Sequence, residues 1–151
     1  EYHLVSLMRF VPLKLTAISL TLIILGSSNA NASIDFWNSN LTWAGQGQCS
    51  AEFTFDSGLE SIDKLTIRFN LIDKNGNKVS TELIELGEFG DYSANRYATS
   101  FVESEEICDE ELRLVVIYAK ATIDGNEIDL IKTNKISVRK FNPFSIQIKD
   151  L

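Results

Sequence analysis

Apolar and polar residues alternate with a period of two along most of this chain, and that pattern constrains the fold more than any other feature. Successive side chains of a β-strand point to opposite faces, so such a segment predicts a strand with one face in a core and the other in water. Two segments show the pattern most clearly, and their expected inward residues are Cys49, Ala51, Phe53 and Phe55 in "CSAEFTF" and Leu65, Ile67, Phe69 and Leu71 in "LTIRFNL". No segment has a convincing helical period.

Turn signals separate further strands. The Asn-Gly pair in "DKNGN" (73–77) and the "DGN" at 124–126 predict hairpins, and the glycines of 87–95 predict a loop. The other expected strands cover 33–43, 78–86, 96–102, 112–123, 127–133, 136–140 and 144–150.

Strands of this length and spacing predict an all-β fold, an antiparallel β-sandwich of seven or eight strands. We expect 33–43 to be an edge strand and 112–123, the most apolar segment, to be central. Pro143 lacks a backbone donor, so the chain should bend or leave its sheet there. Trp37 and Trp43 are expected in the core or closing the sandwich.

The beginning of the chain has the pattern of a secretory signal peptide. Arg9 and Lys14 supply positive charge, 15–25 is a short apolar run, and Ala30-Asn31-Ala32 is a small-residue cleavage site before Ser33. The apolar run is too short to span a membrane. The sequence therefore predicts an upstream extension and leader over 1–32, one exported domain over 33–151, in the periplasm or secreted, and no membrane span.

Charge and histidine content exclude several classes of function. The formal net charge is −7, and loss of the leader removes two basic residues but only one acid, so the domain stays strongly negative and would be repelled by nucleic acid. The only histidine, His3, precedes the domain, which excludes Ser-His-Asp and Cys-His catalysis and the commonest zinc ligand. We expect no catalytic site, cofactor or metal, although paired carboxylates that hydrolyse sugars remain an alternative.

Cys49 and Cys108 are the only cysteines. Export favours a disulfide between them, and no CxxC spacing suggests a redox or metal pair. Cys108 lies within an acidic stretch whose carboxylates are Glu103, Glu105, Glu106, Asp109, Glu110 and Glu111. Three interpretations stay open for this stretch: a solvated connection between strands, a surface for protein docking, and a calcium site.

From "SIDFWNSNLTWAGQGQCSAEFTF" through "LRLVVIYAKATIDGNEI" to "SVRKFNPFSIQIKDL", the chain resembles the IrmA family, the interleukin receptor mimic proteins secreted by pathogenic enterobacteria. The resemblance implies a fibronectin type III-like sandwich, a domain-swapped homodimer, and capture of host interleukins as a virulence function. The segment after Pro143 would suit pairing with a second protomer. The alternative is a structural subunit of an adhesin or pilus that works by terminal strand exchange.

Cytokine-receptor domains bind through loops at one end of the sandwich. We therefore expect the acidic stretch and the loop carrying Phe89 and Tyr92 to form the partner-binding surface, steering a basic partner by charge.

Overall fold

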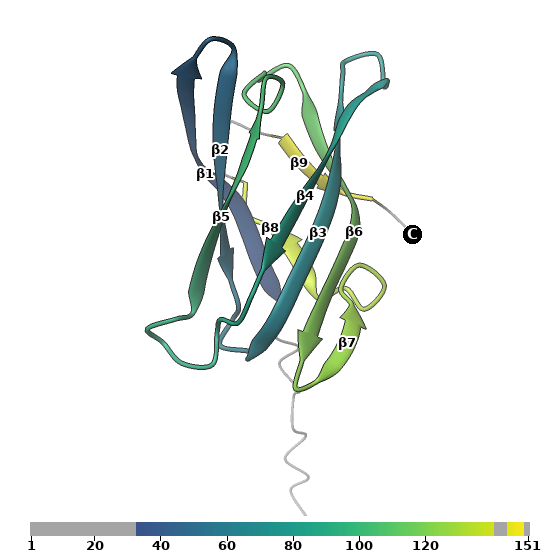
Figure 1. Cartoon of the computed structure of the whole chain (residues 1–151). Coiled ribbons are helices and arrows are strands. Elements are labelled where there is room, and N and C mark those ends of the chain that lie inside the picture. Colours follow the sequence, from purple (N-terminus) through teal and green to yellow (C-terminus); the bar gives the residue numbers. More distant parts are fainter. Residues whose placement is uncertain (1–32, 141–144, 150–151) are drawn as a thin grey trace, which may run out of the picture.

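A computed structural model of the chain describes residues 33–140 and 145–149. These residues form nine strands and no helix (Figure 1). The strands are β1 (Ile34–Gly45), β2 (Gln48–Asp56), β3 (Ile62–Ile72), β4 (Lys78–Leu86), β5 (Tyr97–Ser104), β6 (Arg113–Ile123), β7 (Asn126–Asp129), β8 (Ile136–Val138) and β9 (Ser145–Ile148).

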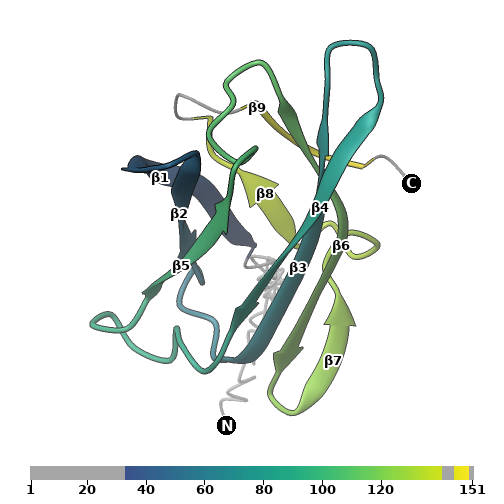
Figure 2. The same cartoon turned by 45° about the horizontal axis from the view of Figure 1, so that its top comes forward.

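Two sheets pack face to face, as the sequence predicted. The first has the order β5-β2-β1-β8, and the second has the order β4-β3-β6-β7 with β9 also on β6 (Figure 2). β1, β2 and β5 thus lie in one sheet, opposite β3, β4, β6 and β7 in the other. This arrangement is a fibronectin type III or immunoglobulin-like sandwich.

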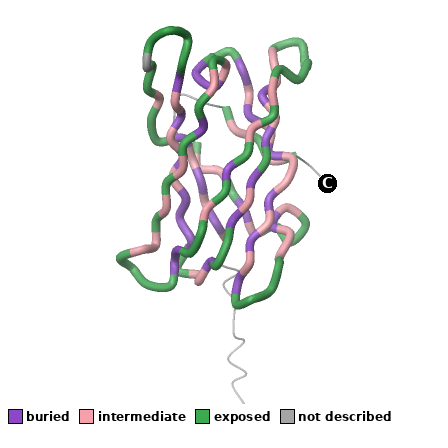
Figure 3. The backbone as a smooth tube through the Cα atoms, in the orientation of Figure 1, coloured by how far each residue is buried: buried purple, intermediate pink, exposed green. Residues whose placement is uncertain are grey.

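The alternating segments form the core between the sheets. All eight residues expected to point inward from β2 and β3 are buried, and Phe53 and Phe69 meet across the sandwich with their ring centroids 5.6 Å apart. Figure 3 shows buried and less buried residues alternating along these strands. The period-two pattern therefore identified the core correctly because each sheet has one dry face.

Both predicted hairpin turns are present. Asp73 holds the β3–β4 turn by accepting the N–H groups of Asn75 and Asn77, each at 2.8 Å. The β6–β7 turn places Asp124 and Gly125 at φ 52° and 73°, the left-handed conformation that a two-residue hairpin needs.

The last part of the chain departs from the prediction. The expected strand over 127–133 ends at Asp129. A turn follows, in which the Lys135 N–H donates to the Leu130 carbonyl at 2.8 Å. The chain then joins the first sheet as β8 and the second as β9, parallel to β1 and β6 respectively. Pro143 and residues 1–32, with the predicted leader, lie outside the described residues.

Two further expectations need correction. Strand β1 is not an edge along its whole length, because β8 pairs with its first three residues. Neither tryptophan lies in the core: Trp37 is half-buried on the outer face of the first sheet, and Trp43 is 62% exposed. Trp43 stands near the β1–β2 turn, beyond the three residues of β1 that pair with β8.

Candidate partner-binding end

The acidic stretch is a connection between β5 and β6 at one end of the sandwich. It lies between the β1–β2 turn and the β3–β4 turn, at the top of Figure 1. Five of its six carboxylate residues are exposed and Glu106 is half-buried. The end of the molecule therefore presents a dense negative charge to solvent.

The loop is fixed to the core by its middle. Cys108 forms the expected disulfide with Cys49 of β2, with their Cα atoms 5.9 Å apart. Next to it, Ile107 is fully buried, and its N–H donates to Ser104 Oγ at 3.1 Å. Near the end of the loop, the Leu112 N–H donates a hydrogen bond to the Asp109 carbonyl at 3.0 Å. The carboxylates thus project from an anchored backbone rather than from a free segment.

Contacts join the loop to both neighbouring turns. The Glu105 carboxylate lies beside Gly47 of the β1–β2 turn, 3.7 Å from the position that a Cβ atom there would take. On the other side, Lys74 Nζ of the β3–β4 turn lies 3.9 Å from Glu111 Oε2. That ion pair is exposed and contributes little stability, but it shows that the three connections form one continuous surface.

We call this end of the sandwich the acidic end; it consists of the acidic stretch at 103–111, the β1–β2 turn and the β3–β4 turn. Trp43, near the β1–β2 turn, adds an apolar group to it. Its cross-strand partner is Cys49, so it shares a face with the disulfide that tethers the loop. Sequence reasoning did not predict that Trp43 is exposed, because an isolated tryptophan in a strand pattern does not indicate whether a second sheet will cover it.

The structure separates the two loops that were expected to form one surface. The loop at 87–96 precedes β5 and the acidic stretch follows it, so they lie at opposite ends of a strand of eight residues, about 25 Å long at roughly 3.3 Å per residue. Tyr92 is exposed, but Phe89 is only 5% exposed and bridges to Ile62. The prediction for Phe89 is therefore wrong: its ring belongs to the core and cannot meet a partner.

Comparison with known proteins now places the chain. The family described as IrmA, interleukin receptor mimic protein A, matches residues 34–138, well over half of the sequence. The chain belongs to the IrmA family. A solved structure of IrmA from Escherichia coli is 28% identical to it, with 76% of this chain and 98% of that chain covered and a TM-score of 0.59. No curated protein sequence matches the chain significantly.

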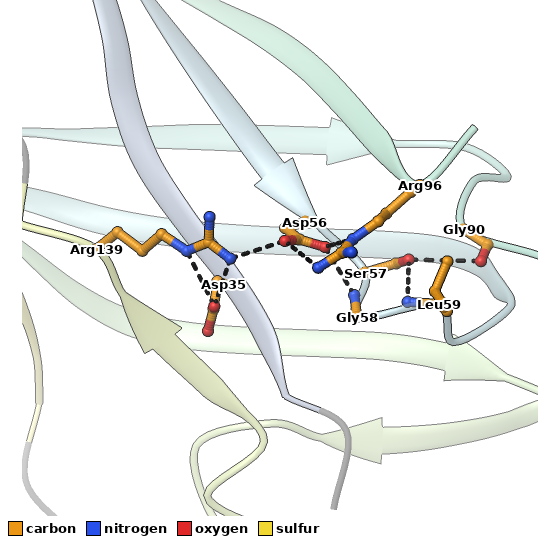
Figure 4. A network of polar contacts seen from close by, with 8 residues as sticks. All are labelled: Asp35, Asp56, Ser57, Gly58, Leu59, Gly90, Arg96 and Arg139. Carbon is orange, nitrogen blue, oxygen red and sulfur yellow. Dashed lines mark hydrogen bonds and ion pairs between the residues drawn. The ribbon is translucent and has the colours of Figure 1, made fainter. Parts of the chain in front are cut away.

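In this member of the IrmA family, one carboxylate among the described residues is buried. Asp56, at the end of β2, is 1% exposed (Figure 4). Its two oxygens lie 2.6 Å from Arg96 Nε and 2.7 Å from Arg139 Nη2, and the Gly58 N–H donates to it at 2.9 Å. The pKa of Asp56 lies below its usual 3.8. The hydrogen bond from Arg96 is the main cause, and it outweighs burial, which by itself would raise the pKa.

The surroundings of Asp56 favour a structural role. Arg139 also forms an ion pair with Asp35, with 3.0 Å between Nη2 and Oδ2. The guanidinium group of Arg139 lies over the ring of Trp37, and that of Arg96 lies over the ring of Tyr97. A carboxylate held ionised by two arginines has no lone pair poised for a substrate proton. No sequence pattern marks this network, because Arg96 and Arg139 lie 40 and 83 positions after Asp56.

Within residues 33–140 and 145–149, no three His, Cys, Asp or Glu side chains come close enough together to hold a metal ion, which the acidic loop would need for a calcium site. The same residues include no helix long and apolar enough to cross a membrane.

Proposed function

We propose that this chain is an exported protein-binding module that captures a host interleukin without catalysis, as a virulence function. The observation that carries the proposal is membership of the IrmA family over nearly all of the sandwich. The family name describes receptor mimicry, and immunoglobulin-like sandwiches commonly bind partners through the loops at one end. The predicted leader and the disulfide are consistent with an oxidising compartment outside the cytoplasm.

The acidic end is the surface that we propose for the partner. Its exposed carboxylates would attract a basic protein surface and raise the association rate, an effect that salt screens. Trp43 would supply a buried aromatic contact once the partner is bound, since tryptophan is enriched among residues that dominate binding energy. Because the disulfide and Ile107 already order the loop, binding would cost little conformational entropy.

A binding screen tests the proposal. The purified domain 33–151 is presented to a panel of interleukins by surface plasmon resonance, with association rates measured at 20 mM and 300 mM salt. We expect binding to at least one basic interleukin, with an association rate that falls at high salt. If no interleukin binds, the proposed function is wrong.

A charge variant then tests the surface. Neutralising four loop acids as E105Q, E106Q, E110Q and E111Q should slow association about tenfold at low salt and leave the fold intact. The matched control neutralises four acids outside the loop, Glu60, Glu85, Glu88 and Glu127, and should change the rate far less. Equal effects of the two variants would move the binding surface away from the acidic end.

We further propose that the protein forms a homodimer by exchange of its C-terminal strand. β9 joins β6 through only four residue pairs, in a parallel arrangement, while Ile146 and Ile148 pack against the core. The same short strand could add to a neighbour in a structural subunit, which is the alternative function. Light scattering separates them: a closed dimer is expected, whereas a polymer that grows with concentration would favour the adhesin or pilus-like subunit.

A further inference from the structure

The edge of β6 has a gap between its two short partners. β7 pairs with Lys120 to Ile123, and β9 pairs with Arg113 to Val116. A backbone hydrogen bond lies at each side of the space between them. The Leu130 N–H donates to the Ala119 carbonyl at 2.9 Å, and the Lys149 N–H donates to the Val116 carbonyl at 3.0 Å. Within the described part of the chain, no strand pairs with Ile117 and Tyr118 on this side.

A hollow of about 340 Å³ occupies this gap. Its lining consists of Ile117, Tyr118, Ala119, Asp129, Ile131, Lys132 and Lys149. The walls are mainly apolar, because two isoleucines, an alanine and the tyrosine contribute them. Cavities that bind small molecules begin at about this size, and they are mostly apolar with a few polar groups that orient the ligand.

Tyr118 is held in place beside the hollow. The Arg68 guanidinium lies 5.4 Å from the centre of its ring, and the Lys120 ammonium lies 5.7 Å from it. β6 also has a bulge here, since Val116 and Tyr118 pair with consecutive residues of β3 and Ile117 is the extra residue. Bulges are common where a strand redirects side chains toward a site. The aromatic wall is therefore ordered before any ligand arrives.

The charges at the rim are opposite to those of the protein as a whole. Lys132 and Lys149 are exposed at the hollow, against one carboxylate, Asp129. Asp129 is already engaged, because it accepts the Lys132 N–H at 3.1 Å and lies 3.7 Å from Lys132 Nζ. Lys149 forms no ion pair with any of the described residues. The rim is thus locally positive in a chain of net charge −7.

From this combination we infer that the hollow is a binding site for a small amphipathic anion, a monocarboxylate with an apolar body. The apolar body would lie against Ile117, Ala119 and Ile131, and the carboxylate would accept from Lys149. The site lies on the β6 edge, whereas the acidic end is formed by turns. The inference does not depend on interleukin capture.

A set of three probes with the same tail tests the inference by NMR. Octanoate, octanol and octylammonium are each titrated into the ¹⁵N-labelled domain below their aggregation concentrations. We expect octanoate to shift the amides of Ile117 to Ala119, Ile131, Lys132 and Lys149, octanol to bind about tenfold more weakly, and octylammonium to leave these amides unchanged. Equal binding of octanoate and octanol, or no saturable shift at these amides, would overturn the inference.

Substitution of the rim lysine distinguishes this site from general attraction to charge. K149Q should weaken octanoate binding about tenfold while leaving octanol binding unchanged. The matched control is K78Q, an exposed lysine at the start of β4. If K78Q weakens octanoate as much as K149Q does, the anion is held by long-range charge alone and the site is refuted.

Discussion

Asp56 is the residue whose environment departs most from that of an ordinary surface acid. Two arginines, each about one-third exposed, cover it on the outer face of the first sheet. Removing one member of a buried ion pair leaves the other charges without a partner, which costs more than the loss of an exposed pair. The network joins β1 and β2 to the residue before β5, Arg96, and to the residue after β8, Arg139.

We predict that D56N lowers the free energy of unfolding by about 2–3 kcal/mol at neutral pH, less than for fully buried partners because water still reaches the arginines. D35N should cost only about 0–1 kcal/mol, because Asp35 is more exposed than Asp56 and has one arginine, Arg139, and the Ser137 hydroxyl as partners. Urea unfolding of both variants checks this prediction. Similar losses would mean that burial of Asp56 adds nothing.

The pH dependence of stability follows from the same residue. The pKa of Asp56 is lower in the folded chain than its usual 3.8, so its contribution is present above that value and disappears as the pH falls through the folded pKa. Between pH 5 and pH 2, the free energy of unfolding of the wild type should therefore fall more steeply than that of D56N. Parallel curves would contradict the proposed ionised state.

Gly90 is a second residue that the fold requires. Its φ is 101°, and a Cβ atom there would lie 2.1 Å from the Glu60 carbonyl oxygen and 2.5 Å from Ser57 Cβ. We predict that G90A costs roughly 3 kcal/mol, against roughly 1 kcal/mol for G76A, which has a similar φ but open space around it. Thermal unfolding measures both, and equal losses would show that only the backbone angle matters.

Individual residues show where sequence reasoning succeeds. Leu65 and Ile67 could be placed in the core because alternation reports which face of a strand is dry. Phe89 and Trp43 could not be placed, because their burial depends on whether a distant segment covers them. The ion pairs of Asp56 fall in the same class, since Asp56 is one of 21 acids with no local mark.

At the scale of elements, the disulfide decides how the acidic loop behaves. It connects residues 59 positions apart, so in the chain-entropy model its loss should cost up to about 4 kcal/mol. We predict that the double variant C49S/C108S stays folded but loses about 2–4 kcal/mol, and that amide exchange accelerates in the loop around Ile107. Wild-type protein in reductant is the control. Unchanged exchange would show that Ile107 alone anchors the loop.

The order of strands could be predicted in part. Turn signals paired β3 with β4 and β6 with β7, because hairpin chemistry is local. The pairing of β8 with β1 and of β9 with β6 is not local and left no pattern in the sequence. For the same reason, the sequence grouped the loop at 87–96 with the acidic stretch, although β5 holds them at opposite ends.

At the scale of the whole molecule, the last residues connect both sheets. The chain passes from β7 in the second sheet to β8 in the first and to β9 in the second again (Figure 2). Ile136 of β8 is buried, and Arg139 ties this region to Asp35 and Asp56. β8 and β9 should therefore contribute differently to the fold.

We predict that truncation after Asn134, which removes β8 and β9, prevents cooperative folding, because the first sheet loses Ile136 and the Arg139 ion pairs. Truncation after Lys140 keeps β8 and should give a folded but less stable protein. Near-ultraviolet circular dichroism and urea unfolding compare the two. Cooperative unfolding of the shorter protein would show that the sandwich does not need β8.

The pairing of β8 with β1 also sets the order of events during synthesis. Residues 34–36 emerge from the ribosome first among the strands, yet their partners at 136–138 follow about a hundred positions later. Contacts of such long sequence separation form late and slowly. Until residues 136–138 have been made, the first three residues of β1 lack one of their two neighbouring strands, so the first sheet can be completed only near the end of synthesis.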